Sequence, residues 1–361
     1  MNSRTKNPAI SVLMPVFNSE DFIRGAVDSI LNQTFKDFEL LVIDDGSTDN
    51  TWKIINSFSD TRLVKLKNPK NKGIVCSLNK ALKLARGKYI ARMDSDDISV
   101  ADRLEKQYKF MENHPEIDVC GSWVRYFTRV PGIRRTYGTK LKPEAIKASF
   151  LFENVIQHPT VVCRKKIFKN KSYSHGYPHA EDYALWVTLA DTSSFAIYPE
   201  ILLNYRLHKN QIGQRENIVQ SDSVKRVHKK LLKKTGVRAS PKEFAIHEKL
   251  CSGQYEPTRD FVEEAHMWLI KIRTANLKSR VFDPKTLDTI LAARWLSTCL
   301  MTGSLRRWVW NRYWQSPFAK KNIGDGGMIR QLWLESTFFP TLRPYVVKMK
   351  SSPLVKRLLL G

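Results

Sequence analysis

The sequence has no long uninterrupted run of apolar residues. A transmembrane helix needs about 18 or more consecutive apolar residues, and no segment of this 361-residue chain approaches that length. Residues 1–8 also lack the apolar core that marks a secretory signal. These absences predict a cytoplasmic or peripheral protein without a membrane span of its own.

Cysteine is scarce and dispersed. The chain has five cysteines, an odd number with no close pair: Cys76, Cys120, Cys163, Cys251 and Cys299. This spacing matches neither a zinc-binding cysteine motif nor a disulfide framework. It favours a reducing compartment.

Acidic residues are few in the second part of the chain. Residues 1–200 carry 30 Lys and Arg against 23 Asp and Glu, whereas residues 201–361 carry 30 against 12. Most of the net charge of +25 therefore belongs to the second part. We expect this part to face something anionic.

Strand-like and helical spacing alternate from residue 10 onward. Short β-like runs occupy residues 10–14, 38–43, 63–66 and 89–93, with helical spacing at 19–33, 49–58, 73–85 and 101–113 between and after them. Such alternation predicts an α/β protein with a mostly parallel, Rossmann-like central sheet. A mixed, partly antiparallel region is expected to continue to about residue 208.

The pattern changes to helices with basic faces after residue 215. Helical spacing recurs at residues 218–235, 257–274, 284–301 and 327–338. We therefore predict two domains. Residues 1–212 form the α/β domain, and residues 213–361 form a basic α-helical extension that associates with acceptor or membrane, or simply packs.

Two acidic clusters follow predicted buried strands. They are Asp44-Asp45-Gly46-Ser47-Thr48-Asp49 and Asp94-Ser95-Asp96-Asp97. The carboxyl ends of parallel strands form the ligand-binding edge of an open α/β sheet. Carboxylates gathered there suit a divalent cation and the polar face of a nucleotide.

Each cluster also has an ordinary structural interpretation. Gly46 and Ser47 could serve only a strand-to-helix turn with a capping side chain. The second cluster is harder to explain in that way, because three carboxylates within four residues repel one another unless a cation lies among them.

Five ordered motifs together resemble glycosyltransferase family 2. They are Pro15-Val16-Phe17-Asn18, the first acidic cluster, Asn71-Lys72-Gly73, the segment from Gly87 to Asp97, and Glu181-Asp182-Tyr183. The resemblance covers about residues 8–212. It implies an inverting transferase of the GT-A fold that uses a nucleotide sugar and a divalent cation, Mn²⁺ or Mg²⁺.

The resemblance also implies roles for individual residues. The donor nucleotide would contact Pro15, Val16, Asn18, Asp44, Asp45, Lys72, Gly73, Arg92, Asp94 and Ser95. Among these, Asp45 would read the base while Asp44 supports its loop. Asp96 would be the principal metal ligand, with His208 as a further metal or diphosphate contact; a surface histidine is the alternative.

Inversion requires a base, and the resemblance places it at Asp182. A carboxylate takes the proton of the acceptor hydroxyl as that oxygen attacks the anomeric carbon. On its own, an acidic pair such as Glu181 and Asp182 more often caps a helix. His158, Glu181 and Trp186 are expected on the acceptor side, although His158 could instead belong to a turn before a strand.

The processive polysaccharide synthases of this family carry a Gln-Xaa-Xaa-Arg-Trp motif. The most similar string here, Ser304-Leu305-Arg306-Arg307-Trp308, lacks the glutamine. This absence favours transfer of a single sugar.

Tryptophan and arginine are mixed in the basic extension. The residues are Trp295, Trp308, Trp310, Trp314 and Trp333 with Arg294, Arg306, Arg307, Arg312 and Arg330. Indoles and cations on amphipathic helices favour an anionic lipid surface. The alternative is a helical core with a solvated basic face. Nucleic acid is not expected, because no recognisable module for it is present.

These inferences combine into one leading hypothesis. The protein is expected to move one hexose or N-acetylhexosamine from a UDP-sugar to a glycan or lipid-linked glycan during assembly of lipopolysaccharide, capsule or related surface polysaccharide. It would work at the cytoplasmic face of the inner membrane. The competing hypotheses are a nucleotidyltransferase, which would release pyrophosphate, and a non-catalytic basic membrane adaptor.

Overall fold

The computed structural model describes residues 7–128, 135–208, 217–319 and 326–337. The chain divides into two compact units. The first comprises residues 1–140 and 156–224, and the second comprises residues 141–155 and 225–361. The domain boundary predicted at residue 212 lies outside the described residues. Among the helices that are described, none is both long enough and apolar enough to cross a bilayer.

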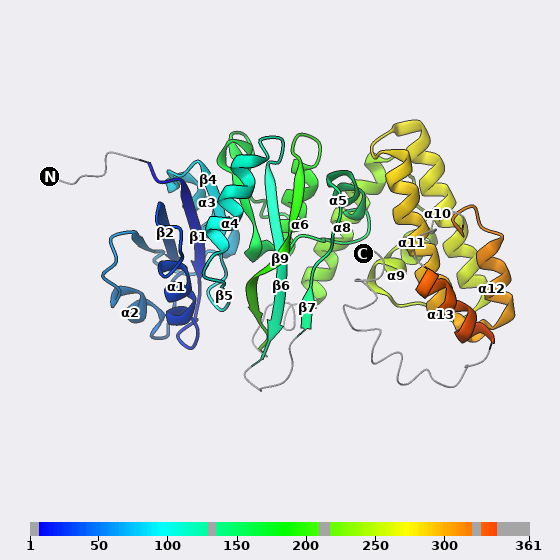
Figure 1. Ribbon diagram of the computed structural model, residues 1–361, viewed down its shortest axis with the longest axis horizontal. Helices are drawn as coiled ribbons and strands as arrows, with labels where there is room; N and C mark the ends of the chain where they lie inside the picture. Colours follow the sequence, from blue (N-terminus) through cyan, green and yellow to red (C-terminus); the bar gives the residue numbers. More distant parts are fainter. Residues whose placement is uncertain (1–6, 129–134, 209–216, 320–325, 338–361) are drawn as a thin grey trace. The chain divides into compact units, whose positions relative to one another are not determined.

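Parallel strands form one side of the sheet in the first unit, as the alternating pattern predicts (Figure 1). Strand β1 (Ile10–Val16) lies between β2 (Phe38–Asp44) and β4 (Tyr89–Arg92), and β3 (Leu63–Lys67) pairs with β2. The GT-A-like α/β fold is thereby confirmed. Because β1, β2 and β4 run in the same direction, their carboxyl ends share one edge.

The remaining strands extend the sheet with mixed directions. Antiparallel pairs join β8 (Val162–Arg164) to β4 and β6 (Val119–Phe127), and β7 (Arg135–Tyr137) to β6. The long strand β9 (Phe195–Arg206) runs parallel to β6 and antiparallel to β5 (Ile98–Ser99). This last pairing brings the end of β9 beside the second acidic cluster.

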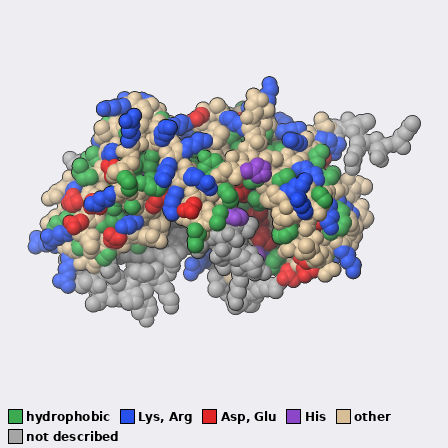
Figure 2. Space-filling model, turned by 180° about the vertical axis from the view of Figure 1, so that it is seen from behind, with side chains coloured by type: hydrophobic (Ala, Val, Ile, Leu, Met, Phe, Trp, Pro, Cys, Tyr) green, Lys and Arg blue, Asp and Glu red, His purple; other side chains and the backbone are tan. Residues whose placement is uncertain are grey.

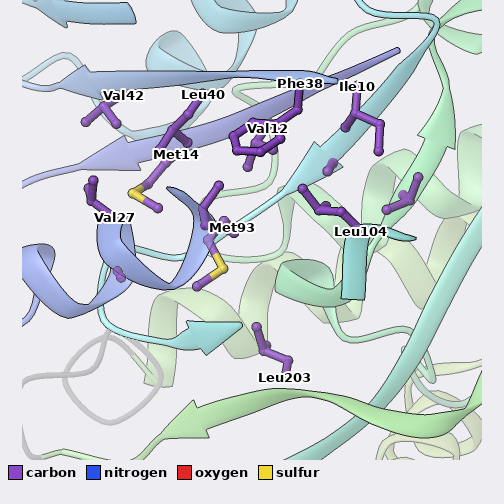
Figure 3. Packing of buried hydrophobic residues seen from close by; sticks show 14 of the residues in the cluster. Ile10, Val12, Met14, Val27, Phe38, Leu40, Val42, Met93, Leu104 and Leu203 are labelled. Atoms are coloured by element: carbon purple, nitrogen blue, oxygen red, sulfur yellow. The ribbon is translucent and has the colours of Figure 1, made fainter. Parts of the chain in front are cut away.

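Helices cover both faces of the sheet. Helices α1 (Ile23–Leu31), α2 (Thr51–Asn56) and α4 (Arg103–Asn113) share one core with alternate residues of the strands. Figure 3 shows part of this core, including Val12, Met14 and Val27. Helix α3 (Ile74–Leu84) contacts β1 and β2 outside that cluster, so it covers the opposite face.

A buried polar network joins the amino-terminal ends of β1, β2 and β4. The Ser11 hydroxyl donates to Glu39 at 2.7 Å and accepts from the backbone N–H of Gly87 at 2.8 Å. Arg86 donates two side-chain hydrogen bonds to Glu39, at 2.9 and 2.7 Å. The network fixes the chain just before β4, at the end of the sheet opposite the acidic clusters.

The first unit also contains α6 (Glu181–Leu189), and α8 (Asn217–Lys234) begins in it and continues into the second. The other helices of the second unit are α5 (Pro143–Ser149), α9 (Pro241–Ser252), α10 (Arg259–Ser279), α11 (Pro284–Met301), α12 (Arg307–Trp314) and α13 (Gly326–Thr337). Helices α8, α10, α11 and α13 match predicted helices. The sequence reading missed α5, α9 and α12.

The tryptophans and arginines of the second unit separate into two groups. Trp295 is fully buried, Arg294 forms an ion pair with Glu153, and Arg312 donates two hydrogen bonds to Glu263. The exposed group consists of Arg306, Arg307, Trp314, Arg330 and Trp333. Core packing therefore accounts for part of this composition. Figure 2 shows Lys and Arg side chains spread over the visible face rather than gathered in one patch.

The polar network generates a stability prediction. Substituting Glu39→Ala should lower the free energy of unfolding of the first unit by about 3 kcal/mol, since it strands a partly buried guanidinium. The matched control is Glu105→Ala, whose carboxylate accepts only from the exposed Lys109 and from Thr34 at the surface among the described residues. That change should cost at most about 1 kcal/mol. Denaturant unfolding followed by circular dichroism measures both, and equal losses would contradict the importance of the network.

Candidate active site

Three chain segments meet at the carboxyl edge of the parallel strands. Val16, the last residue of β1, is paired in register with Asp44, the last residue of β2. On the other side of β1, Leu13 is paired with Arg92, which ends β4. The turn after each strand therefore opens on the same edge, where open α/β sheets bind their ligands.

The two aspartates after β2 organise their own loop. Asp44 is fully buried, accepts the backbone N–H of Ser47 at 3.0 Å, and lies 3.8 Å from the Lys67 ammonium. Asp45 accepts hydrogen bonds from three groups: the Asn68 amide at 2.7 Å, the backbone N–H of Gly73 at 2.8 Å, and the backbone N–H of Lys72, which lies 3.1 Å from each carboxylate oxygen. Asp45 thus anchors residues 68–73, and base recognition by it stays a prediction.

The turn after β1 is tied to both acidic clusters. Asn18 adopts the left-handed conformation, with φ of 47°, and its side-chain oxygen accepts the backbone N–H of Thr48 at 2.9 Å. The hydroxyls of Ser19 and Ser95 lie 2.8 Å apart. Pro15 and Val16 are buried at the end of β1. These contacts align the three segments that were predicted to hold the nucleotide.

Asp94, Asp96 and Asp97 form a compact carboxylate cluster. One oxygen of each lies within 4.8 Å of the others. Burial and the charge of Asp94 raise the pKa of Asp96, and the same causes, with Asp96 added, raise the pKa of Asp97 further. Oδ2 of Asp97 is buried without a hydrogen-bond partner among the described residues. Close repelling carboxylates with spare oxygen atoms fit a hard divalent cation.

Arg206, the last residue of β9, and His208, two residues further along the chain, both contact this cluster. Nε2 of His208 lies 2.9 Å from Oδ2 of Asp96. Arg206 donates its backbone N–H to Asp97 at 2.8 Å and its Nε–H to the Asp96 carbonyl at 2.7 Å. The sequence reading assigned His208 to the site and counted Asp97 in the acidic cluster, but it gave neither Asp97 nor Arg206 a role of its own. The signals for such roles were the position of Asp97 next to Asp96 and the position of Arg206 two residues before His208.

Two buried arginines, Arg92 and Arg103, donate hydrogen bonds at the end of β4, next to the cluster. Arg92 donates to Asp94 at 2.6 Å, and its Nε and Nη1 have no hydrogen-bond partner in the described part of the chain. Arg103, which the sequence reading also missed, donates to the Arg92 carbonyl at 2.8 Å. Burial lowers the pKa of Arg103, while the charge of Asp97 opposes this change. Two guanidinium groups therefore contact the end of β4: Arg92 through the Asp94 carboxylate, and Arg103 through the Arg92 carbonyl.

Glu181 and Asp182 occupy the first turn of α6. Asp182 is half-buried and accepts the backbone N–H of Tyr183 at 2.7 Å. Glu181 is 7% exposed, and burial raises its pKa against the lowering effect of Arg92. The charge of Asp94 adds to this rise in the pKa of Glu181. The catalytic role of Asp182 stays a prediction.

His158 and Trp186 lie deeper than an acceptor-facing position suggests. His158 is 8% exposed, and its Nε2 lies 2.8 Å from the Tyr173 hydroxyl. Burial lowers the pKa of His158 well below its usual range, with a further contribution from Arg92. Trp186 is fully buried and meets His158 edge to face, with ring centroids 5.9 Å apart. Both side chains are buried and pack against each other, and contact with an acceptor stays a prediction.

Comparison with known proteins identifies relatives for the catalytic part of the chain. The family model for glycosyl transferase family 2 matches residues 11–171. An uncharacterized glycosyltransferase of Methanocaldococcus jannaschii is 37% identical over 206 residues, covering 55% of this chain and 71% of the relative. An Escherichia coli UDP-Glc:alpha-D-GlcNAc-diphosphoundecaprenol beta-1,3-glucosyltransferase, WfaP, is 32% identical over 238 residues, covering 61% of this chain and 89% of WfaP.

Solved structures share the fold at low sequence identity. Residues 1–349 of Staphylococcus aureus TarS in complex with UDP-GlcNAc match with a TM-score of 0.52 and 18% identity, over 90% of each chain. A longer TarS structure is covered over 55% of its length. The mannosyltransferase PcManGT of Pyrobaculum calidifontis, in complex with GDP-Man and Mn²⁺, matches with a TM-score of 0.50 and 13% identity, over 89% of each chain.

The Asp45 contacts generate a prediction about loop 68–73. In Asp45→Ala, trypsin should cleave after the exposed Lys70 and Lys72 at least about tenfold faster than in the wild type. The loop loses charge-assisted hydrogen bonds worth about 1.5–3 kcal/mol each, and about 1.4 kcal/mol corresponds to a factor of ten. Mass spectrometry of the early fragments measures the rates. Asp37→Ala, at an exposed aspartate before β2, is the control; an unchanged rate in Asp45→Ala would contradict the anchoring role.

Proposed function

The chain belongs to glycosyl transferase family 2, and from that premise we propose that it transfers a single hexose or N-acetylhexosamine from a UDP-sugar to a lipid-linked glycan, with inversion at the anomeric carbon. One observation carries the proposal. The carboxylates of Asp94, Asp96 and Asp97 meet His208 and Arg206, more than 100 residues away in sequence, at the ligand-binding edge of the sheet.

The names of the relatives support the donor and acceptor classes. WfaP and a second Escherichia coli enzyme, WfgD, are named for UDP-Glc as donor and a diphosphoundecaprenol-linked GlcNAc as acceptor. WfgD is 34% identical over 210 residues and is covered over 80% of its length. A polyprenyl-linked acceptor would place the reaction at the cytoplasmic face of the inner membrane. Assembly of a surface polysaccharide is the biological role that we propose.

The catalytic cation would be held by Asp96 with Asp94 and Asp97, whose oxygen-only donor set suits Mn²⁺ or Mg²⁺. When bound, such an ion neutralises the charge that develops on the departing diphosphate. Two side chains of the protein lie beside these carboxylates. His208 lies against Asp96. Arg92 donates to Asp94, and its Nε and Nη1 have no hydrogen-bond partner among the described residues.

Asp182 is the base in this proposal. Its carboxylate takes the proton from the acceptor hydroxyl while that oxygen bonds to the anomeric carbon, and the bond from that carbon to the UDP oxygen breaks. Asp182 lies in the first turn of α6, where the helix macrodipole interacts favourably with a negative charge. Glu181, raised in pKa by burial, is less suited to stay ionised. The half-buried Asp182 is also the more accessible carboxylate of the pair.

The competing nucleotidyltransferase hypothesis differs in its product. It would release pyrophosphate, whereas a glycosyltransferase releases UDP from a UDP-sugar. The family membership favours the transferase, and an assay of released UDP separates the two. Docking on an anionic lipid surface through the exposed Arg306, Arg307 and Trp314 is part of the proposal for a lipid-linked acceptor.

Substitution of the base should separate chemistry from donor binding. Asp182→Asn should lower kcat by about 10² to 10⁴, the span expected for a lost general base, while the Kd for the UDP-sugar changes only a few-fold. Released UDP and isothermal titration measure the two quantities, and NMR of the wild-type product should show inverted anomeric configuration. Asp191→Asn, at an exposed position beyond α6, is the control. A near-normal rate in Asp182→Asn would require another base.

Removal of the cation ligand should abolish turnover without unfolding the protein. Asp96→Ala should lose donor hydrolysis and Mn²⁺ binding because the diphosphate loses its counter-charge. A chelator should abolish the activity of the wild type, and addition of Mn²⁺ or Mg²⁺ alone should restore that activity. Activity, calorimetric Mn²⁺ binding and circular dichroism provide the measurements. Full activity of the wild type in the presence of chelator would refute the metal assignment.

A further inference from the structure

A second group of metal-binding side chains lies in the helical unit, outside the residues that the family model matches. His228 belongs to α8, and His247, Glu248 and Cys251 belong to α9. One ligand atom of each of the four lies within 4.8 Å of the others. His247 and Cys251 are four residues apart and so share one face of α9. The sequence reading missed this group because its members have no recognised motif spacing.

The imidazoles of the group are buried and closely packed. His228 is 1% exposed and His247 is fully buried, with ring centroids 5.2 Å apart and planes nearly perpendicular. Nδ1 of His228 lies 2.7 Å from Oε1 of Glu248. Trp268 donates its indole N–H to Nδ1 of His247 at 3.2 Å. Nε2 of His247 is buried with no hydrogen-bond partner of normal geometry among the described residues.

The charges around the group are compatible with a bound divalent cation. Arg294, the basic residue whose charge influences both His247 and Cys251, is already paired with Glu153. Glu248 and a Cys251 thiolate together supply two negative charges, which one divalent ion neutralises. Among the described residues, the Glu248 carboxylate has one hydrogen-bond partner, His228. Placing a half-buried thiol and a carboxylate beside two buried imidazoles costs solvation free energy that a bound cation would offset.

We propose that His228, His247, Glu248 and Cys251 bind one zinc ion that fastens α8 to α9. Imidazole, thiolate and carboxylate are the ligands of four-coordinate zinc sites. Tetrahedral bonds of about 2.0–2.3 Å place ligand atoms on the order of 3.5 Å apart, so the present separations need only a modest contraction. With all four positions filled by protein, the site is structural rather than catalytic.

The site makes specific demands on its surroundings. Cys251 binds as a thiolate, and its proton leaves to solvent. His247 binds through Nε2, so its ring proton shifts to Nδ1 and the Trp268 indole gives up its hydrogen bond. Thiolate and imidazole ligands select zinc, whereas the oxygen-only cluster of Asp94, Asp96 and Asp97 selects Mn²⁺ or Mg²⁺. The two sites should therefore load independently, and this proposal does not depend on the proposed reaction.

Metal content of the full chain tests the proposal. The protein is purified without a metal-affinity tag, incubated with Zn²⁺, freed of excess ion by gel filtration and analysed by mass spectrometry for metals. The wild type should retain about one zinc per chain, as should Asp96→Ala. His228→Ala and Cys251→Ser should lose it. Cys76→Ser, at a partly buried cysteine of α3, is the matched control and should keep it. A wild type that retains no zinc, or ligand variants that retain as much as the wild type, would overturn the proposal.

Cobalt provides a readout that does not rely on a variant that could fail to fold. Co²⁺ added to the metal-free wild type should give the intense absorption of tetrahedral cobalt together with a thiolate charge-transfer band, and excess Mn²⁺ should not remove them. Cys76→Ser should give the same spectrum, and Cys251→Ser should lose the thiolate band. If the wild-type spectrum shows no thiolate band, Cys251 is not a ligand and the proposal fails.

Discussion

Repulsion among three carboxylates at the end of β4 is the constraint on which the site depends. Asp94, Asp96 and Asp97 lie close together, and burial, together with the repulsion among them, raises the pKa of Asp96 and of Asp97. The protein offsets this repulsion with arginines from separate elements. Arg92 comes from β4 itself, Arg103 from α4, and Arg206 from the end of β9. The compensation is incomplete, which leaves the cluster ready for a divalent ion.

The topology of the sheet makes this compensation available. Strand β9 pairs with β5, the two-residue strand directly after the acidic cluster, and so returns the chain to the carboxyl edge. At the opposite edge, Ser11, Glu39 and Arg86 hold the amino-terminal ends of the central strands together. A rigid sheet between these two polar edges keeps the loops after β1, β2 and β4 aligned. The strained turn at Asn18 is maintained because the loop after β2 bonds to it through Ser47 and Thr48.

In the helical unit, too, buried charges are compensated by partners of opposite charge. Its buried arginines are paired individually, Arg294 with Glu153 and Arg312 with Glu263, so the large positive charge of this region lies mainly on the surface. The cluster around His247 differs from these pairs because nitrogen, sulfur and oxygen ligand atoms gather at one place. If both proposed sites bind metal, hard oxygen ligands in one unit and softer ligands in the other would allow one chain to distinguish two metals.

The sequence alone determined the parallel α/β core and the edge that carries the site, because strand and helix periodicities are local and the acidic clusters directly follow their strands. Motif order also made Asp96, Asp182 and His208 candidates for the site, and their roles stay predictions. Only the tertiary structure decided that Arg206 and Arg103 support the cluster, that Asp45 holds residues 68–73, and that Trp186 and Trp295 are buried. These facts depend on which distant strands and helices meet. Long-range pairing and burial are set by the packing of the whole unit, and no local pattern encodes them.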